Sequence, residues 1–203
     1  MIARGDRVLL RRPVPADRGE FIALRTASAR FLLPWEPSSP SGKHSPPGRT
    51  FSRILKTANN QANQRFLVCD RSTGSIMGLI SLNQIFRGPF QSAYTGYWIA
   101  EPYAGKGFMT QALSLVLTHA FTRMKLHRIE ANLMPRNQAS RALVKKLGFR
   151  FEGLAKRYLQ IAGRWEDHEH WAITAEEWPP APSRAASTRR RRAGSRARAR
   201  TMA

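Results

Sequence analysis

Cysteine is almost absent from this sequence, with Cys69 the only one among 203 residues. A single cysteine excludes a disulfide framework and any metal site built from several thiolates, as is usual in a reducing compartment. The sequence also lacks an apolar run approaching the roughly 18 residues that a membrane-spanning helix needs, and its arginine-dotted start lacks the apolar centre of a secretory signal. We therefore expect a soluble, cytoplasmic protein with no membrane partner.

Acidic residues are scarce: 13 Asp and Glu stand against 34 Lys and Arg, which gives a formal net charge of +21. Eight arginines and no acid fall within residues 179–203, so this segment carries +8 and residues 1–178 carry +13. Such a field favours polyanions such as nucleic acid. Because residues 179–203 offer almost nothing apolar to bury, we predict a disordered Arg-rich tail, which either contacts RNA or only solubilises the chain.

Hydrophobic periodicity predicts one domain over residues 1–178, an α/β or α+β fold whose mixed, mostly antiparallel sheet has helices on both faces. Asp17 followed by Glu20 predicts a capping box for the first helix. Prolines, serines and glycines crowd residues 34–50, which predicts a loop. The expected strands are residues 65–70, 75–86, 93–100, 128–133, 150–159 and 164–173, and the expected helices are residues 17–30, a segment after Thr50, residues 109–121 and 138–147.

The turn Gly105-Lys106-Gly107 joins a predicted strand to the most regular predicted helix. Glycines here let backbone N–H groups point outward, and the helix beginning near Phe108 aims its free donors and positive dipole end at the same point. A phosphate or pyrophosphate fits such a nest. A plain helix-entry turn is the alternative, and the sequence contains neither the P-loop pattern nor, with Thr110 in the third position, the dinucleotide fingerprint.

Two sequence blocks carry a resemblance to a known family. Residues 102–107 (PYAGKG) match the two small positions of the acetyl-CoA motif of the GNAT acetyltransferase superfamily, although Pro102 replaces its Gln or Arg. Asn137, Ser140 and the Gly148-Phe149 pair resemble its N-x-x-[AS]…GF block. Residues 31–37, 87–90 and 163–168 resemble the ribosomal-protein-alanine N-acetyltransferase (RimJ-like) branch, and the similarity extends from Arg7 to Trp178.

The resemblance implies the GNAT fold and acetyl-CoA as the donor substrate. In this family the strand before the turn binds pantetheine and the thioester carbonyl through its main chain, and the turn and helix start bind the pyrophosphate. Asn137 is expected to bond the pantetheine or an amide of the cofactor. The expected cofactor-binding residues are Trp98, Ile99, Ala100, Gly105, Lys106, Gly107, Phe108, Met109, Thr110 and Asn137.

Acetyl transfer to an amine needs a deprotonated nucleophile, stabilisation of the oxyanion and a proton for the departing thiolate. Val144 occupies the place of the tyrosine acid of many relatives, so the resemblance assigns the acid to Ser140, whose alternative role is local helix capping. Glu130 and Glu36 are candidate bases, each with a salt bridge as its alternative, and a water chain without a dedicated base is also open.

Three further features have interpretations that remain open. His168 and His170 share a strand face, but two histidines are weak grounds for zinc, and we expect no metal. Trp35 and Tyr97 are candidate walls of the acceptor groove, with the core as the simpler place for Tyr97.

The resemblance implies that the chain acetylates the N-terminal α-amine of a protein, a ribosomal protein in the namesake case. Two alternatives remain at this point: a small amine such as a polyamine, amino acid or antibiotic as the acceptor, or an RNA-binding assembly factor with vestigial catalysis. A narrow pocket with an acidic base would favour a polyamine, whereas an open groove beneath Trp35 would favour a peptide.

Overall fold

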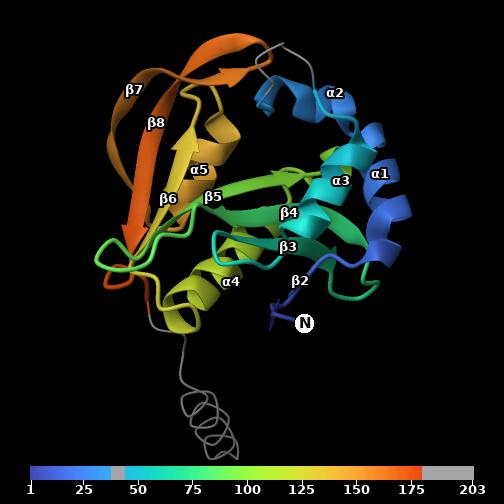
Figure 1. Ribbon diagram of the computed structural model, residues 1–203, viewed down its shortest axis with the longest axis horizontal. Helices are drawn as coiled ribbons and strands as arrows, with labels where there is room; N and C mark the ends of the chain where they lie inside the picture. Colours follow the sequence, from blue (N-terminus) through green and yellow to red (C-terminus); the bar gives the residue numbers. More distant parts are fainter. Residues whose placement is uncertain (38–43, 180–203) are drawn as a thin grey trace, which may run out of the picture.

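The computed structural model describes residues 1–37 and 44–179, in which eight strands form one mixed sheet with helices on both faces (Figure 1). The strands are β1 (Ala3–Arg4), β2 (Val8–Arg11), β3 (Asn63–Asp70), β4 (Ile76–Asn83), β5 (Ser92–Ile99), β6 (Arg128–Leu133), β7 (Arg150–Ile161) and β8 (Arg164–Thr174). The helices are α1 (Arg18–Ala27), α2 (Ala29–Leu32), α3 (Pro47–Lys56), α4 (Phe108–Thr122) and α5 (Gln138–Lys146). Short 3-10 turns η1 (Pro15–Asp17), η2 (Leu33–Trp35) and η3 (Glu101–Tyr103) complete the order.

The strands lie in the order β1-β2-β3-β4-β5-β6-β8-β7. Strands β3, β4 and β5 form the expected antiparallel meander, and β7 and β8 form the expected hairpin. β5 and β6 are the parallel pair. The mixed, mostly antiparallel sheet predicted from the sequence is therefore confirmed.

The two faces of the sheet bury different helices. On one face, which we call the α4 face, Leu113, Val116 and Leu117 of α4 are fully buried against the strands. Each such side chain contributes about 1.5–3 kcal/mol by leaving water. On the other, the α1 face, α1 and α3 cover β3 and β4 through a smaller cluster that contains Phe21 and Phe51. That second cluster includes no residue of β6, β7 or β8.

β5 and β6 pair over only three positions, from Ser92 with Arg128 to Tyr94 with Glu130. Beyond them β5 continues to Ile99 and β6 to Leu133 without pairing, and we call this divergence the split. One backbone edge of each strand is thus left without a neighbouring strand. The split lies at the end of β5 that leads into η3 and α4 (Figure 1).

The predicted capping box at Asp17 is wrong. Asp17 belongs to η1, and its carboxylate accepts two hydrogen bonds from Arg11 at 2.7 Å and one from the Val14 N–H at 2.8 Å, so it caps nothing in α1. Glu20 accepts a hydrogen bond from the Ile76 N–H at 2.6 Å. Tertiary partners on β2 and β4 therefore take both carboxylates away from the helix start.

The expected loop over residues 34–50 is too long at both ends. Trp35 completes η2, and α3 begins at Pro47 rather than after Thr50. Proline suits this first helical position because its fixed φ is already helical and no N–H is required there. The predicted helix over residues 17–30 is interrupted at Ser28, between α1 and α2.

The Arg-rich tail lies outside the described residues, apart from Pro179 at its start. Within residues 1–37 and 44–179, no helix has the length and apolarity needed to cross a membrane.

Candidate active site

The turn before α4 forms an open cluster of backbone donors. Gly105 and Gly107 have φ values of +71° and +80°, in the left-handed region that glycine adopts without strain. A Cβ at either position would meet nothing within 4 Å, so the turn faces open space. In the described part of the chain, no backbone carbonyl accepts from the N–H groups of residues 105–110. These donors and the dipole of α4 converge where an anion can bind.

Arg7 stands beside this turn and was not found from the sequence. Its guanidinium donates to the Lys106 carbonyl at 3.1 Å and lies 4.0 Å from the centre of the Phe108 ring. Gln111 of α4 ties the same segment down by accepting from the N–H groups of Arg7 and Val8 at 2.9 and 3.0 Å. No sequence pattern links Arg7 to a turn about 100 residues away, since only the fold joins them.

The end of β5 is held tightly against β4. Ala100 is buried and its N–H donates to the Met77 carbonyl at 2.9 Å. Opposite Ile99 lies Gly78, where a Cβ would collide with the Trp98 carbonyl oxygen. The Trp98 ring packs edge-on against Phe21 at 5.6 Å. β4 thus fixes one edge of Trp98, Ile99 and Ala100, while the edge toward β6 carries no strand partner.

Helix α5 brings Ser140 close to Tyr97 on the α4 face. Asn137 is the N-cap of α5, because its Oδ1 accepts from the Ser140 N–H at 3.1 Å, so the local capping role falls to Asn137 and not to the Ser140 hydroxyl. Tyr97 packs on the core, as the simpler interpretation expected, and burial raises its pKa to about 12, although the neighbouring Ser140 side chain opposes this. Its hydroxyl is buried, and no hydrogen-bond partner lies within reach of it in residues 1–37 and 44–179. Val144 is fully buried in the core.

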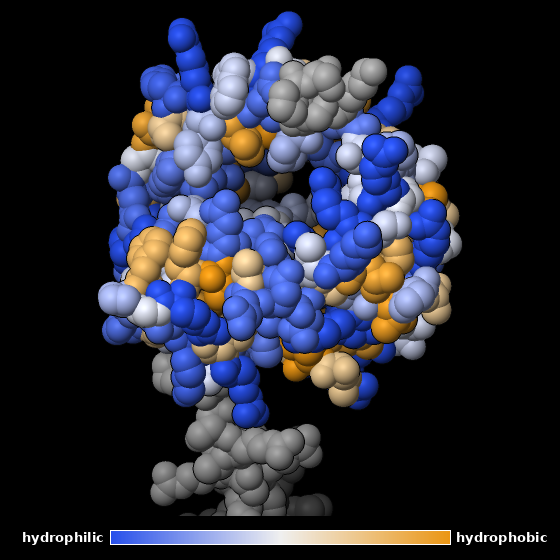
Figure 2. Space-filling view, viewed as in Figure 1, coloured by the Kyte–Doolittle hydropathy of each residue, from blue (hydrophilic) through white to orange (hydrophobic). Residues whose placement is uncertain are grey.

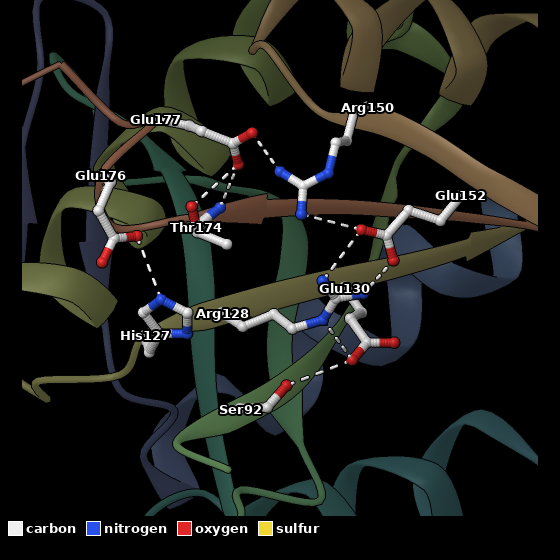
Figure 3. A network of polar contacts seen from close by, with 9 residues as sticks. All are labelled: Ser92, His127, Arg128, Glu130, Arg150, Glu152, Thr174, Glu176 and Glu177. Atoms are coloured by element: carbon white, nitrogen blue, oxygen red, sulfur yellow. Dashed lines mark hydrogen bonds and ion pairs between the residues drawn. The ribbon is translucent and has the colours of Figure 1, made fainter. Parts of the chain in front are cut away.

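Glu130 lies on the opposite, α1 face and is engaged in a network of polar contacts (Figure 3). Its Oε1 accepts from Arg128 Nε at 2.9 Å and from Ser92 Oγ at 3.4 Å. Arg128 also pairs with Glu152, a contact that raises the pKa of Arg128 and lowers that of Glu152. The salt-bridge alternative for Glu130 is present in the structure, and the network ties β5 and β6 to β7 at the closed end of the split.

Glu36 is also paired with an arginine, Arg25 of α1. Its carbonyl accepts from the Ala162 N–H at 3.4 Å, and the next residue, Pro37, forms an isolated bridge with Ile161. The segment after η2 therefore reaches the tip of the β7–β8 hairpin.

Arg136 provides a second connection between η2 and the hairpin. It donates to the Pro34 carbonyl at 3.2 Å and contacts Glu166 of β8 at 3.5 Å. Its guanidinium also lies 5.0 Å from the Trp35 ring centre. We call the connected residues 34–37, Arg136, Ile161 and Glu166 the arch.

The space-filling view shows an opening in the middle of this face of the molecule, with hydrophilic residues around it (Figure 2). Ribbon and surface agree that the opening lies between α2 and the β7–β8 hairpin on one side and the central strands on the other (Figure 1). Small molecules usually bind in closed cavities, whereas an opening of this kind suits an extended chain end.

The structure brings most of the predicted cofactor residues together and separates the predicted catalytic ones. Trp98, Ile99 and Ala100 lead through η3 into the turn and α4, although the Met109 side chain is in the core and only its N–H faces the turn. Ser140 lies on the α4 face, Glu130 on the α1 face and Glu36 in the arch. Among the described residues, no three His, Cys, Asp or Glu side chains are grouped to hold a metal ion.

Comparison with known proteins identifies the class. Residues 7–150 match the family described as "Acetyltransferase (GNAT) domain". The chain is 32% identical over 177 residues to the ribosomal protein uS5-alanine N-acetyltransferase of Escherichia coli, which covers 86% of this chain and 91% of that protein. The structure of Mycobacterium smegmatis RimJ in complex with CoA-disulfide has a TM-score of 0.78 and 36% identity, covering 86% of this chain and 85% of that one.

The chain therefore belongs to the GNAT acetyltransferase family and is an acetyl-CoA-dependent N-acetyltransferase. Within that family it resembles the ribosomal-protein-alanine N-acetyltransferases, as the sequence blocks predicted.

Other similarities are shorter. The probable N-acetyltransferase YjcK of Bacillus subtilis is 45% identical over 108 residues, and the match spans 53% of this chain and 60% of that protein. A spermidine N(1)-acetyltransferase of Escherichia coli is 28% identical over 114 residues, which is 55% of this chain and 59% of that protein.

Proposed function

We propose that the chain transfers acetyl from acetyl-CoA to the N-terminal α-amine of a protein, and that this protein is a component of the ribosome. The observation that carries the proposal is the similarity to the uS5-alanine enzyme, which extends over 91% of that protein. The strongly basic chain suits a ribosomal destination, because positive charge concentrates a protein near RNA without a specific contact.

On the α4 face, the proposed cofactor site uses main-chain donors for its charged end. The N–H groups of residues 105–110 bind the pyrophosphate, and Arg7 adds a positive charge at the same turn. The backbone of Trp98, Ile99 and Ala100 binds pantetheine along the free edge of β5. Asn137 contributes its Nδ2, because its Oδ1 caps α5.

The acceptor approaches from the α1 face, through the opening beneath the arch. The amine and the thioester then meet at the split, where β5 and β6 no longer pair. Ser140 donates a proton to the departing sulfur from the α4 face. Glu36 and Glu130, the bases expected from the sequence, are each held by an arginine, so neither is a free carboxylate at this meeting point.

A polyamine is the second candidate acceptor, and the similarity to spermidine acetyltransferase is the observation that favours it. A polyamine carries several positive charges, which need unpaired carboxylates to receive them. Around the opening, however, Glu36, Glu130 and Glu166 are paired with Arg25, Arg128 and Arg136. This charge arrangement supports a peptide acceptor over a polyamine.

The test is to incubate the purified protein with acetyl-CoA and a peptide that begins with alanine and continues as a basic ribosomal-protein terminus. The same peptide with a blocked α-amine is the control for side-chain acetylation, and spermidine is the competing acceptor. We expect a mass gain of one acetyl group on the free peptide only. Faster turnover of spermidine would establish a polyamine as the acceptor. Retained RNA binding without acetyl-CoA binding would favour the hypothesis of an RNA-binding assembly factor.

A further inference from the structure

Buried polar atoms without partners gather at the split. Among the described residues, five buried side-chain nitrogen or oxygen atoms have no hydrogen-bond partner. Four of them lie on β5, β6 and β8: Thr95 Oγ1, Tyr97 Oη, Asn132 Oδ1 and His170 Nε2. Buried polar atoms are normally hydrogen-bonded, so unpaired ones on both faces of the sheet at the split indicate a site that a ligand completes.

Asn132 and His170 form one half of this cluster, on the α1 face. They are register partners across β6 and β8, which places their side chains on the same face of the sheet. Asn132 lies two residues beyond Glu130, in the part of β6 that no longer pairs with β5. Both side chains are therefore at the opening of the split and on the side from which we propose that the acceptor arrives.

Tyr158 holds these two side chains in place. Its hydroxyl accepts from Asn132 Nδ2 at 3.1 Å, and its ring lies edge-on to the His170 ring at 4.9 Å. The β7–β8 register shifts between Ala155 and Leu159, and the positive φ of +49° at Arg157 reorients the chain just before Tyr158. With Tyr158 occupying Nδ2 and the ring face, Asn132 Oδ1 and His170 Nε2 remain available.

We propose that Asn132 Oδ1 and His170 Nε2 form the subsite for the acceptor amine and that His170 is the base for acetyl transfer. This inference rests on the proposed function. Asn132 Oδ1 accepts a hydrogen bond from one N–H of the amine and so orients it. His170 Nε2 takes a proton from the ammonium and becomes an imidazolium.

The proposed reaction transfers one acetyl group and releases one proton overall. The neutral amine attacks the thioester carbon, a C–N bond forms and the C–S bond breaks. Two protons leave the nitrogen in total. One passes through His170 to solvent; Ser140 gives its proton to the departing sulfur, and the second proton from the nitrogen, carried by solvent, restores the Ser140 hydroxyl. The products are the N-acetylated acceptor, coenzyme A with a free thiol, and one proton.

His170 is the basic group at this place that is free to act. Glu130 Oε1 already accepts from Arg128 and Ser92. The Nδ1 of the neighbouring His168 lies 3.1 Å from the Glu166 carbonyl, and burial lowers the pKa of His168. The ionisable groups that interact with His170 are Tyr158 on β7 and His168 on β8, and the Glu130–Arg128 pair and Tyr94 lie on the same face of the sheet along β6 and β5.

The experiment compares His170→Gln, Asn132→Ala and the control His168→Gln for kcat, KM and the pH dependence of kcat/KM. It uses the full chain with acetyl-CoA and with both the alanine peptide and spermidine as acceptors. We expect His170→Gln to lower kcat about 100-fold and to remove the acidic limb of the pH profile, which is the magnitude and signature of a general base. Asn132→Ala raises the KM for the amine, and His168→Gln leaves the acidic limb in place.

Two results overturn the assignment: an acidic limb that survives in His170→Gln, or one that disappears in Glu130→Gln instead. The acetyl-CoA dissociation constant, measured by calorimetry, should be unchanged in all four variants, and a change in His170→Gln would mean that the substitution disturbs the cofactor face. The wild-type preference between peptide and spermidine tests the proposed acceptor separately, because the effect of His170→Gln is read on whichever amine the wild type acetylates.

Discussion

The Trp98 carbonyl oxygen lies against Gly78 so closely that a Cβ on Gly78 would overlap it. This approach sets the position of the β5 end, whose backbone is the proposed support for pantetheine. We expect Gly78→Ala to force β4 and β5 apart and to lower the free energy of unfolding by about 2 kcal/mol, the usual cost of overpacking. The displaced carbonyl should also weaken acetyl-CoA binding. Urea denaturation and calorimetry measure the two effects.

Gly96→Ala is the matched control, because Gly96 lies on the same strand pair and a Cβ there would make an ordinary 3.5 Å contact with Ser81 Oγ. Equal losses of stability in the two variants would show that any methyl group added between β4 and β5 destabilises the sheet, and that the close approach to Trp98 has no special cost.

Arg7 offers a test of the anion-binding turn. Its guanidinium is fixed between the Lys106 carbonyl and the Phe108 ring, next to N–H groups that no backbone carbonyl of the described residues accepts from. A charge-assisted contact to a phosphate contributes about 1.5 kcal/mol, so Arg7→Ala should weaken acetyl-CoA binding about tenfold and reduce its salt dependence. Titration calorimetry at two salt concentrations is the measurement.

Arg4→Ala removes an equal charge from an exposed position on the neighbouring strand. If both variants weaken binding by the same factor, the effect of Arg7 is that of net charge, and its place beside the turn is irrelevant.

The sequence predicts well where local pattern determines structure. The apolar stripe of α4 and the strand from Arg128 to Leu133 appear where expected. The glycines of the turn are also informative, because their left-handed conformations are a local requirement. The helix, the strand and the turn around the proposed cofactor site can therefore be predicted from local sequence.

Contacts between residues far apart in the sequence cannot be predicted in this way. Asp17 and Glu20 have the spacing of a capping box, but Arg11 and the Ile76 N–H bind them instead. Glu130 is on the strand predicted over residues 128–133, yet the sequence does not show that Arg128 and Ser92 donate hydrogen bonds to it. Asn132 and His170 come together only because β6 pairs with β8, and no motif joins two residues so far apart.

Stability at acid pH should depend on Asp17. Burial alone would raise its pKa, but hydrogen bonds from Arg11 and the Val14 N–H, together with the charge of Arg11, outweigh burial and lower it. A lowered pKa in the folded state means that the stabilisation is complete above the unfolded-state pKa of about 3.9 and disappears as pH falls through the folded-state value. Asp17→Asn should therefore lower the free energy of unfolding by about 3 kcal/mol at pH 7.

The difference between wild type and Asp17→Asn should begin to shrink below about pH 4, where the carboxylate of the unfolded chain becomes protonated, and should disappear once pH is below the lowered pKa of the folded state. Denaturation curves from pH 3 to 7 follow it, with Asp6→Asn as the control because the Asp6 side chain is exposed and has no partner among the described residues. A difference that stays constant with pH would assign the effect to packing.

Ser140 and Tyr97 give the sharpest test of the α4 face. Since the pKa of Tyr97 is raised to about 12, its hydroxyl stays protonated at any assay pH and can only donate a proton. If Ser140 protonates the leaving thiolate, Ser140→Ala should lower kcat about 100-fold with little change in the KM for acetyl-CoA, because the interaction exists only in the transition state. Tyr97→Phe should lower kcat less and change stability little, because within residues 1–37 and 44–179 the deleted hydroxyl has no hydrogen-bond partner. A normal kcat in Ser140→Ala together with loss of activity in Tyr97→Phe would transfer the role of the acid to Tyr97, whose hydroxyl is next to the Ser140 side chain.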